Sequence, residues 1–272
     1  MSRPPKLSII TINYNNAQGL RKTIESVVSQ TSPEFEYLVI DGGSIDGSVD
    51  IIKKYEKSIS YWISEKDKGI YHAMNKGILQ AKGEYCQFLN SGDYLLANNV
   101  TELMLEDMPE CNILYGNKLR DFNGISKVEK SFEGRQITLL DMFMSTFFHS
   151  PAYIKKSLFE TYGLYDETLK IVSDWKFYLI SIGMNNEKVA YRDIDLVWFD
   201  SNGISTTNKD LDTIERSRVL EEVIPRSILL DYQQFAKDSL IIKRIKQNKL
   251  AWFIVINLYR LLFRFDKYII KK

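Results

Sequence analysis

The sequence has little of what defines several common classes of protein. Only two of its 272 residues are cysteine, Cys86 and Cys111. Both stand in strand-like contexts, so we expect reduced core thiols and no disulfide framework. No run of about 18 apolar residues occurs, so we expect no transmembrane helix. The first residues lead into a strand without the apolar stretch of a signal peptide, which favours a cytoplasmic chain.

The common nucleotide-binding motifs are also missing. A dinucleotide-binding domain needs Gly-x-Gly-x-x-Gly between its first strand and helix, because the glycine backbone holds the pyrophosphate. Here the first predicted strand, Leu7–Ile12, is followed by Asn13-Tyr-Asn-Asn-Ala-Gln-Gly19. The P-loop pattern is absent as well. These absences argue against nicotinamide chemistry.

What the chain does have is apolar residues for a core and an uneven distribution of charge. Hydrophobic residues make up 44% and aromatic residues 12% of the sequence, which excludes a disordered chain. The net charge is only +1, but residues 237–272 hold ten Lys or Arg against two Asp. A basic tail on an acidic body predicts an anionic surface as partner of the tail. The tail is too apolar, and the body too acidic, for nucleic acid.

Apolar strand patterns alternate with helical patterns, which is typical of βαβ units and of a mainly parallel sheet. In such a sheet the loops that leave the carboxyl ends of the strands share one edge and form the ligand crevice. Three of these loops carry Asp41, Asp67 and Asp93, so we expect a site there. The predicted strands are 7–12, 37–40, 60–63 and 85–89, and the predicted helices between them include 19–30 and 71–81.

The fourth of these strands, Tyr85–Leu89, stops abruptly in Asn90-Ser-Gly-Asp93. These four residue types are all frequent in turns, so the segment could be a simple corner. An apolar strand that ends in a carboxylate is also where α/β folds place ligand chemistry. The segment alone leaves both interpretations open.

Four segments of the chain carry a resemblance: Leu7–Asn15, Val39–Ser48, Ser64–Gly77 and Phe88–Asp93. Together they resemble family 2 glycosyltransferases of the GT-A fold, most similarly the inverting enzymes of bacterial exopolysaccharide and colanic-acid synthesis. The resemblance is strong over residues 6–115 and recognisable to about 207. It implies an α/β, Rossmann-like, mainly parallel central sheet flanked by helices. Residues 1–210 would form the catalytic domain, with a nucleotide-sugar half (1–115) and an acceptor half (116–210), and residues 211–272 a helical, basic-amphipathic extension.

The resemblance implies a UDP- or GDP-linked sugar as donor and a divalent cation, Mg²⁺ or Mn²⁺, as cofactor. The ion absorbs charge on the departing diphosphate and needs only one or two protein carboxylates. Asp93 and Asn90 match the Asp-x-Asp region that holds it, although three positions that can be acidic are neutral here. The positions implied to bind the nucleotide sugar are Thr11, Asn13, Tyr14, Asp41, Asp67, Lys68, Asn75, Ser91, Asp93 and His149.

The resemblance also places the catalytic carboxylate at Asp174. An acceptor hydroxyl that attacks the anomeric carbon must lose its proton to a base, and one-step displacement inverts the sugar. The alternative is that Ser173 or Asp174 merely caps the helix that begins there. His149 could lie near the diphosphate or the metal, or be an ordinary hydrogen-bonded structural residue.

We therefore expect transfer of a sugar from a nucleotide diphosphate sugar to a hydroxyl of a saccharide acceptor, linked to polyprenyl diphosphate, in cell-surface polysaccharide synthesis. The alternatives are a nucleotide-sugar hydrolase, a nucleotidyltransferase, or a catalytically silent nucleotide-sugar-binding protein. Residues 249–270 combine apolar, aromatic and basic side chains, as interfacial helices do. This predicts a cytoplasmic protein, peripheral on the inner face of the plasma membrane. The alternatives for this helix are packing on the catalytic domain or a dimer contact.

Overall fold

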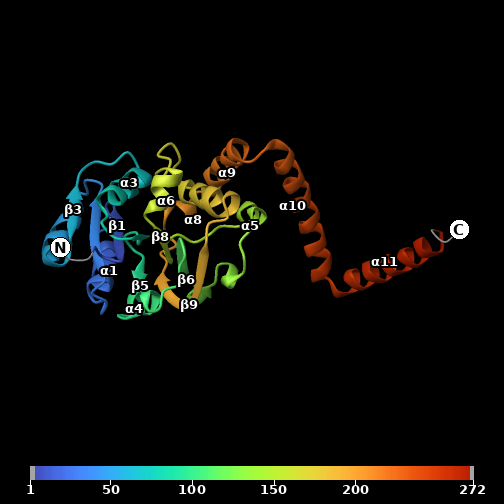
Figure 1. The fold of residues 1–272 in the computed structure, drawn as a ribbon, viewed down its shortest axis with the longest axis horizontal. Coiled ribbons are helices and arrows are strands. Elements are labelled where there is room, and N and C mark those ends of the chain that lie inside the picture. The colour runs from blue at the N-terminus through green and yellow to red at the C-terminus, as the bar shows by residue number, and fades with distance from the viewer. Residues whose placement is uncertain (1–3, 270–272) are drawn as a thin grey trace. The chain divides into compact units, whose positions relative to one another are not determined.

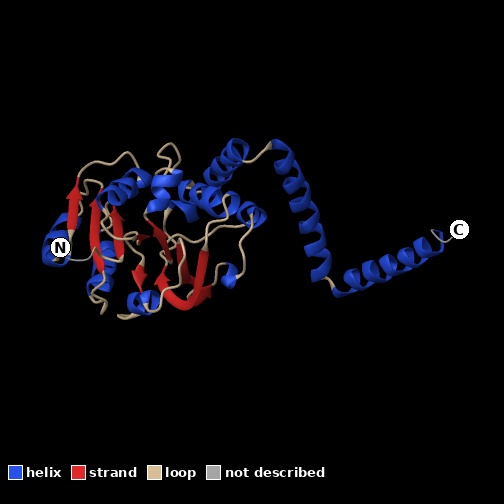
Figure 2. Ribbon diagram, in the orientation of Figure 1, coloured by secondary structure: helices blue, strands red, loops and turns tan. Residues whose placement is uncertain are grey.

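The computed structural model describes residues 4–269. The chain divides into two compact units, Met1–Val219 and Leu220–Lys272. Figure 2 shows strands alternating with helices in the first unit, whereas the second unit is helical. The boundary expected after residue 210 lies inside helix α9 (Lys209–Val223).

The first four strands form the parallel half of one sheet, in the order β3-β2-β1-β4. The register pairs Asn13 with Asp41 and Asp41 with Ser64, so three strands end side by side at the carboxyl edge. This confirms the expected convergence of the loops that follow them. The strands are β1 (Leu7–Asn13), β2 (Phe35–Asp41), β3 (Tyr61–Ser64) and β4 (Tyr85–Phe88).

Beyond β4 the sheet is mixed. β8 pairs antiparallel with both β4 and β6, while β6 and β9 are parallel to each other. β5 closes the order as an antiparallel edge strand on β9, and β7 forms a hairpin with β6. The α/β class is therefore confirmed, with parallel pairing concentrated in the first half. The strands are β5 (Tyr94–Leu95), β6 (Ile113–Phe122), β7 (Ile125–Glu129), β8 (Ala152–Lys155) and β9 (Val189–Trp198).

Alternation along β1 places helices on both faces of the sheet, because successive side chains of a strand point to opposite faces. Ile9 belongs to the apolar cluster that includes Leu20 of α1 (Ala17–Val28). Ile10 lies instead beneath Gly77 of α3 (Ile70–Gln80), where a Cβ on the glycine would come within 2.4 Å of Ile10 Cγ2. The absence of a side chain at Gly77 thus lets α3 pack directly on the strand. Figure 1 shows α1 and α3 beside β1.

The remaining helices of the first unit cover the sheet and connect its second half. The alternative that Ser173 or Asp174 merely caps its helix is wrong: α7 begins at Ser173, and among the described residues no side chain caps it. These helices are α2 (Ser48–Lys54), α3 (Ile70–Gln80), α4 (Val100–Leu105), α5 (Leu139–Met144), α6 (Ser157–Tyr162), α7 (Ser173–Tyr178), a π-helical turn Leu179–Met184, α8 (Ile204–Thr207) and α9.

The second unit contains α10 (Arg226–Gln247) and α11 (Lys249–Ile269), which contact each other. Within residues 4–269, no helix has the length and apolar character needed to cross a membrane. Both cysteines are buried free thiols, as expected.

Replacing Gly83 with alanine should destabilise the first unit. A Cβ at this position would lie 2.6 Å from Ser8 N and 2.7 Å from the carbonyl carbon of Leu7, and backbone atoms cannot move aside as a flexible side chain does. Such overpacking costs about 1–3 kcal/mol. Urea unfolding should show this loss for Gly83→Ala but not for the control Gly203→Ala, since nothing lies within 4 Å of a Cβ there. Equal midpoints for the two variants would contradict this packing.

Candidate functional site

The carboxyl edge of β1–β3 is held together by the carboxylate of Asp41, which is fully buried. Its Oδ1 accepts hydrogen bonds from Asn13 Nδ2 at 2.7 Å and Ser44 Oγ at 2.6 Å. Its Oδ2 accepts from Ser64 Oγ at 2.6 Å and from the backbone N–H groups of Gly43 and Ser44. Burial alone would raise the pKa of Asp41, but these donors outweigh it and hold the pKa below its ordinary value.

Two further residues predicted to bind the nucleotide make contacts inside the protein. Thr11 is fully buried, and its Oγ1 accepts a hydrogen bond from Tyr37 OH at 3.0 Å. Asn75 donates to the carbonyl oxygen of Tyr165 at 2.9 Å and accepts from its N–H at 3.0 Å. Asn75 therefore fixes the loop before α7 to helix α3.

Tyr14, Asp67 and Lys68 lie at the surface of the same edge. A Cβ on Gly42 would lie 3.1 Å from the Tyr14 ring and 3.3 Å from Asp67 Oδ2, so these two side chains flank the glycine. Asp67 also contacts Lys76 Nζ at 2.6 Å, while Lys68 is exposed. The exposed Tyr14 ring and the partly buried Asp67 carboxylate stand beside the buried Gly42, and an aromatic ring with a carboxylate suits a flat, hydrogen-bonding base.

The other predicted residues line a pocket of about 370 Å³. Its lining includes residues of the segment after β4, the end of β6, the segment before β8, the first turn of α7 and the loop after β9. It brings together five predicted residues that are far apart in the sequence, whereas the predicted residues on β1–β3 and α3 are not part of its wall. These five are Asn90, Ser91, Asp93, His149 and Asp174.

His149 joins the two halves of this group. Its Nδ1 lies 3.1 Å from Asp174 Oδ2, and its Nε2 lies 3.4 Å from Asn90 Nδ2. The other oxygen of Asp174 accepts a hydrogen bond from Tyr71 OH at 2.9 Å. The Asp174 side chain is only 14% exposed. Each of its oxygens still has a second lone pair for a ligand.

The pair is electrostatically matched. Burial alone would raise the pKa of Asp174, but the hydrogen bond and charge of His149 and the Tyr71 hydroxyl lower it overall. Burial would lower the pKa of His149, but Asp174 raises it above its ordinary value. Asp174 is therefore an ionised carboxylate at neutral pH, held at the pocket wall with its proton-accepting oxygens in place.

Asp93 is more deeply buried, with 3% of its surface exposed. Its Oδ1 accepts a hydrogen bond from the backbone N–H of Asp200 at 2.8 Å, whereas its Oδ2 has no hydrogen-bond partner in the part of the chain that the structure describes. Burial raises the pKa of Asp93 to about 7, and the neighbouring Asp200 carboxylate adds to this rise. A cation bound at Asp93 Oδ2 would stabilise the ionised form of this buried carboxylate.

The donor set at this point fits a hard divalent cation. Asn90 Oδ1 is also buried without a partner in the described residues, so two oxygen ligands face the pocket. Among these residues no group of three His, Cys, Asp or Glu is arranged to hold a metal. Mg²⁺ and Mn²⁺ sites need few protein ligands when substrate phosphates and water complete the shell. The site therefore fits an ion shared with a phosphorylated ligand, and not a closed protein cage.

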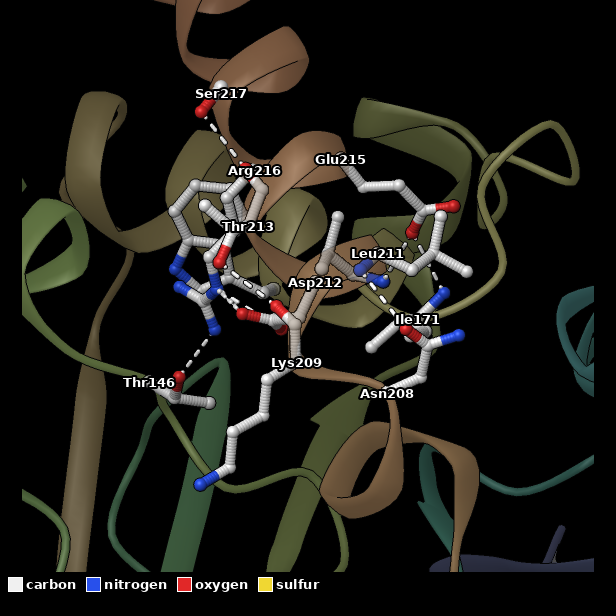
Figure 3. A network of polar contacts seen from close by, with 12 residues as sticks. Thr146, Ile171, Asn208, Lys209, Leu211, Asp212, Thr213, Glu215, Arg216 and Ser217 are labelled. Atoms are coloured by element: carbon white, nitrogen blue, oxygen red, sulfur yellow. Dashed lines mark hydrogen bonds and ion pairs between the residues drawn. The ribbon is translucent and has the colours of Figure 1, made fainter.

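Sequence reasoning missed Glu215 and Arg216 of α9, which Figure 3 shows among their partners. The buried Glu215 carboxylate accepts hydrogen bonds from the backbone N–H groups of Lys170, Ile171 and Val172, the three residues directly before α7. Through them it fixes the first turn of α7, which carries Asp174.

Arg216 holds the other side of the pair. Its guanidinium lies 4.3 Å from the ring centre of Trp175, pairs with Asp212 and donates to Thr146 Oγ1 at 2.5 Å. Trp175 follows Asp174, and Thr146 lies three residues before His149. One helix therefore braces both segments of the His149–Asp174 pair. Residues at this distance in sequence give no local pattern by which they could be found.

Replacing Glu215 with glutamine should lower the free energy of unfolding by about 2 kcal/mol, because hydrogen bonds to a charged acceptor contribute about 1.5–3 kcal/mol and one buried N–H would lose its partner. Urea unfolding measures the change. Glu221→Gln removes the same charge from an exposed position of the same helix and should leave stability unchanged. A Glu215→Gln protein as stable as the control would show that the hydrogen bonds of Glu215 do not stabilise the segment before α7.

Comparison with known proteins places the chain in a family. The model named glycosyl transferase family 2 matches residues 8–160. An uncharacterised glycosyltransferase of Mycobacterium tuberculosis is 30% identical over 218 residues, which covers 76% of this chain and 79% of the relative. A PGL/p-HBAD biosynthesis glycosyltransferase of Mycobacterium bovis is 26% identical over 222 residues, covering 78% and 84% of the two chains.

Solved structures share the fold. Residues 1–349 of TarS from S. aureus, in complex with UDP-GlcNAc, match with a TM-score of 0.62 at 21% identity, over 75% of this chain and 61% of that one. The mannosyltransferase PcManGT of Pyrobaculum calidifontis, in complex with GDP-Man and Mn²⁺, matches with a TM-score of 0.57 at 16% identity, over 74% and 59%. The present chain thus spans about 60% of each of these structures, and the likeness establishes the GT-A fold.

Proposed function

The chain belongs to glycosyl transferase family 2, and on that premise we propose that it transfers a sugar, with inversion, from a nucleotide diphosphate sugar to a hydroxyl group of a saccharide acceptor. One observation carries the proposal. The ionised carboxylate of Asp174 and the buried carboxylate of Asp93 line the same pocket. His149 contacts Asp174 and lies close to Asn90, which stands near Asp93 in the sequence.

The donor base and ribose would occupy the edge of β1–β3. Tyr14 and Asp67 would flank the base over Gly42, and Lys68 would reach toward the diphosphate. The bound UDP-GlcNAc of TarS and GDP-Man of PcManGT support a UDP- or GDP-linked donor. Four buried or internally bonded residues would shape the floor beneath the nucleotide and present its contacts: Thr11, Asn13, Asp41 and Asn75.

The diphosphate would point from this edge into the pocket, past Ser91. Asp93 Oδ2 and Asn90 Oδ1 would hold the Mg²⁺ or Mn²⁺, for which the Mn²⁺ of PcManGT is a precedent. When bound, such an ion acts as a Lewis acid that stabilises the charge of the departing diphosphate. Asp93 and Asn90, which follow β4, would hold that charge in the pocket that Asp174 also lines.

Asp174 would act as the general base. The acceptor hydroxyl attacks the anomeric carbon on the face opposite the diphosphate, its proton moves to Asp174, and the bond to the diphosphate breaks. His149 and Tyr71 keep the carboxylate ionised and oriented before the attack. A single displacement with a single base inverts the anomeric configuration.

The acceptor would be a saccharide linked to polyprenyl diphosphate, extended during cell-surface polysaccharide synthesis of the exopolysaccharide type. The apolar residues of α11 support this setting, because many are exposed: Leu250, Phe253, Ile254, Leu258, Tyr259, Leu261, Leu262 and Phe263 each show at least half of their surface. With its basic residues, α11 would lie on the anionic inner face of the plasma membrane as a peripheral anchor. Each basic residue near such a surface contributes about 1 kcal/mol.

Replacing Asp174 with asparagine should abolish sugar transfer, with a loss of at least about a hundredfold in kcat, because no base remains for the acceptor proton. Binding of the nucleotide should stay within about twofold, measured as the thermal shift with UDP- or GDP-sugars and Mn²⁺. Asp50→Asn, an exposed site on α2, serves as the matched control.

The same experiment separates the alternatives. Transfer that survives in Asp174→Asn would refute the base assignment. Release of free sugar without any acceptor product would identify a hydrolase, and donor binding without turnover by the wild-type protein would identify a silent binding protein.

Changing Leu258 and Leu262 together to glutamate should reduce binding to vesicles that contain phosphatidylglycerol at least tenfold, because both side chains are more than half exposed on α11 and would enter the lipid interface. Co-sedimentation measures the effect. Gln233→Glu with Gln234→Glu adds the same charge to exposed positions of α10. Equal sedimentation of all three proteins would show that α11 does not meet the membrane.

A further inference from the structure

The Asn90-Ser-Gly-Asp93 segment offers a single carboxylate, yet a second one stands beside it. The space that a side chain on Gly92 would occupy is filled by Asp200: a Cβ built on the glycine would lie 2.7 Å from Asp200 Oδ2 and 3.3 Å from its Cγ. We propose that Asp200, from the loop after β9, is the second carboxylate ligand of the divalent cation and takes the place of the acid that the segment lacks. This inference rests on the proposed function.

Within the described residues, the hydrogen bonds that the Asp200 side chain accepts go to its Oδ1. Its Oδ1 accepts hydrogen bonds from the N–H of Asn202 at 3.1 Å and from Asn202 Nδ2 at 2.7 Å. This leaves Oδ2 on the side of Gly92. The backbone N–H of Asp200 meanwhile donates to Asp93 Oδ1 at 2.8 Å, which ties the two residues together and leaves Asp93 Oδ2 without a partner in the described residues. Both residues line the pocket.

The arrangement of Gly92 explains why the acid comes from elsewhere. Its φ of +107° lies in the left-handed region that L side chains rarely adopt, so an aspartate there would be strained as well as obstructed. A carboxylate delivered from the end of β9 reaches the same place without that strain. The absence of a side chain at Gly92 therefore makes room for the Asp200 carboxylate.

The cationic side chains near Asp93, His149 and Lys118, lower its pKa, but each of them is also engaged by another carboxylate. His149 contacts Asp174, and Arg216 pairs with Asp212. Lys118 lies against the rings of Phe148 and Phe199, 3.7 and 4.3 Å from their centres, and within 3.4 Å of Glu129. Two neighbouring carboxylates repel each other when both are ionised. A divalent cation bound between them attracts both, and this attraction offsets the repulsion.

Asp200 also begins the segment that leads through Asn202 and Gly203 into α8. A cation held by Asp93 and Asp200 would therefore tie this segment to the end of β4. Ion binding and the order of the segment over the diphosphate would then be one event.

The test is Mn²⁺ binding by the full chain, followed by electron paramagnetic resonance with saturating UDP or GDP. Asp200→Asn keeps the shape of the side chain and removes its charge, and should weaken Mn²⁺ binding at least tenfold. Asp93→Asn should weaken it further, whereas Asp210→Asn, at an exposed position of α9, should bind as the wild type does. Circular dichroism confirms folding of each variant.

A second variant guards against a mere loss of structure. Asp200→Cys places a thiolate in the site and should exchange the preference for Mn²⁺ for one for Cd²⁺, since soft ligands favour soft ions. The charge-transfer absorption of a Cd²⁺–thiolate bond reports this directly, with the wild type, which retains Cys86 and Cys111, as the background.

Different failures are distinguishable. Wild-type Mn²⁺ affinity in Asp200→Asn, with affinity lost in Asp93→Asn, would overturn the role of Asp200 and leave the proposed function standing. No Mn²⁺ binding by the wild type with either nucleotide would overturn the metal site as a whole. Sugar transfer by the same preparation would then show that the transferase proposal survives without it.

Discussion

The contact on which the candidate site depends is the pair between His149 and Asp174. A carboxylate that is 14% exposed is costly to keep ionised unless a charge and hydrogen bonds compensate for lost hydration. His149 and Tyr71 provide this compensation, and each comes from a different part of the first unit. The pair therefore keeps Asp174 ionised and also joins three parts of the fold, because it forms only when the segment before β8, the first turn of α7 and helix α3 are in contact.

Other parts of the unit serve to keep that junction in place. Glu215 gathers three backbone N–H groups before α7, while Arg216 reaches the side of His149 through Thr146. Asn75 fixes the preceding loop to α3. On the opposite wall, the N–H of Asp200 holds Asp93. The pocket thus has a base side and a cation side, each fixed by hydrogen bonds from segments remote in sequence.

Local pattern was enough to predict the first half of the fold. Four apolar strands with helices between them form the parallel order β3-β2-β1-β4, and the loops with Asp41, Asp67 and Asp93 follow strands that end at the same edge of the sheet. Pattern could not show that β8, from residues 152–155, inserts between β4 and β6, since pairing between distant strands is a tertiary choice. Pattern could not exclude a cap at Ser173 or Asp174 either, because the partners that Asp174 has instead, His149 and Tyr71, are remote in sequence.

In the candidate site, too, some residues could be found from the sequence and others only from the folded structure. Asp93, His149 and Asp174 came from resemblance to a family and line one pocket. Asp200 and Glu215 stand in segments whose composition is unremarkable, and only the folded chain shows what they touch. The most direct test of the account is the anomeric configuration of the transferred sugar, measured by proton NMR on the product formed with a donor of known configuration. A single base at Asp174 predicts the configuration opposite to that of the donor; retention of the donor's configuration would contradict it.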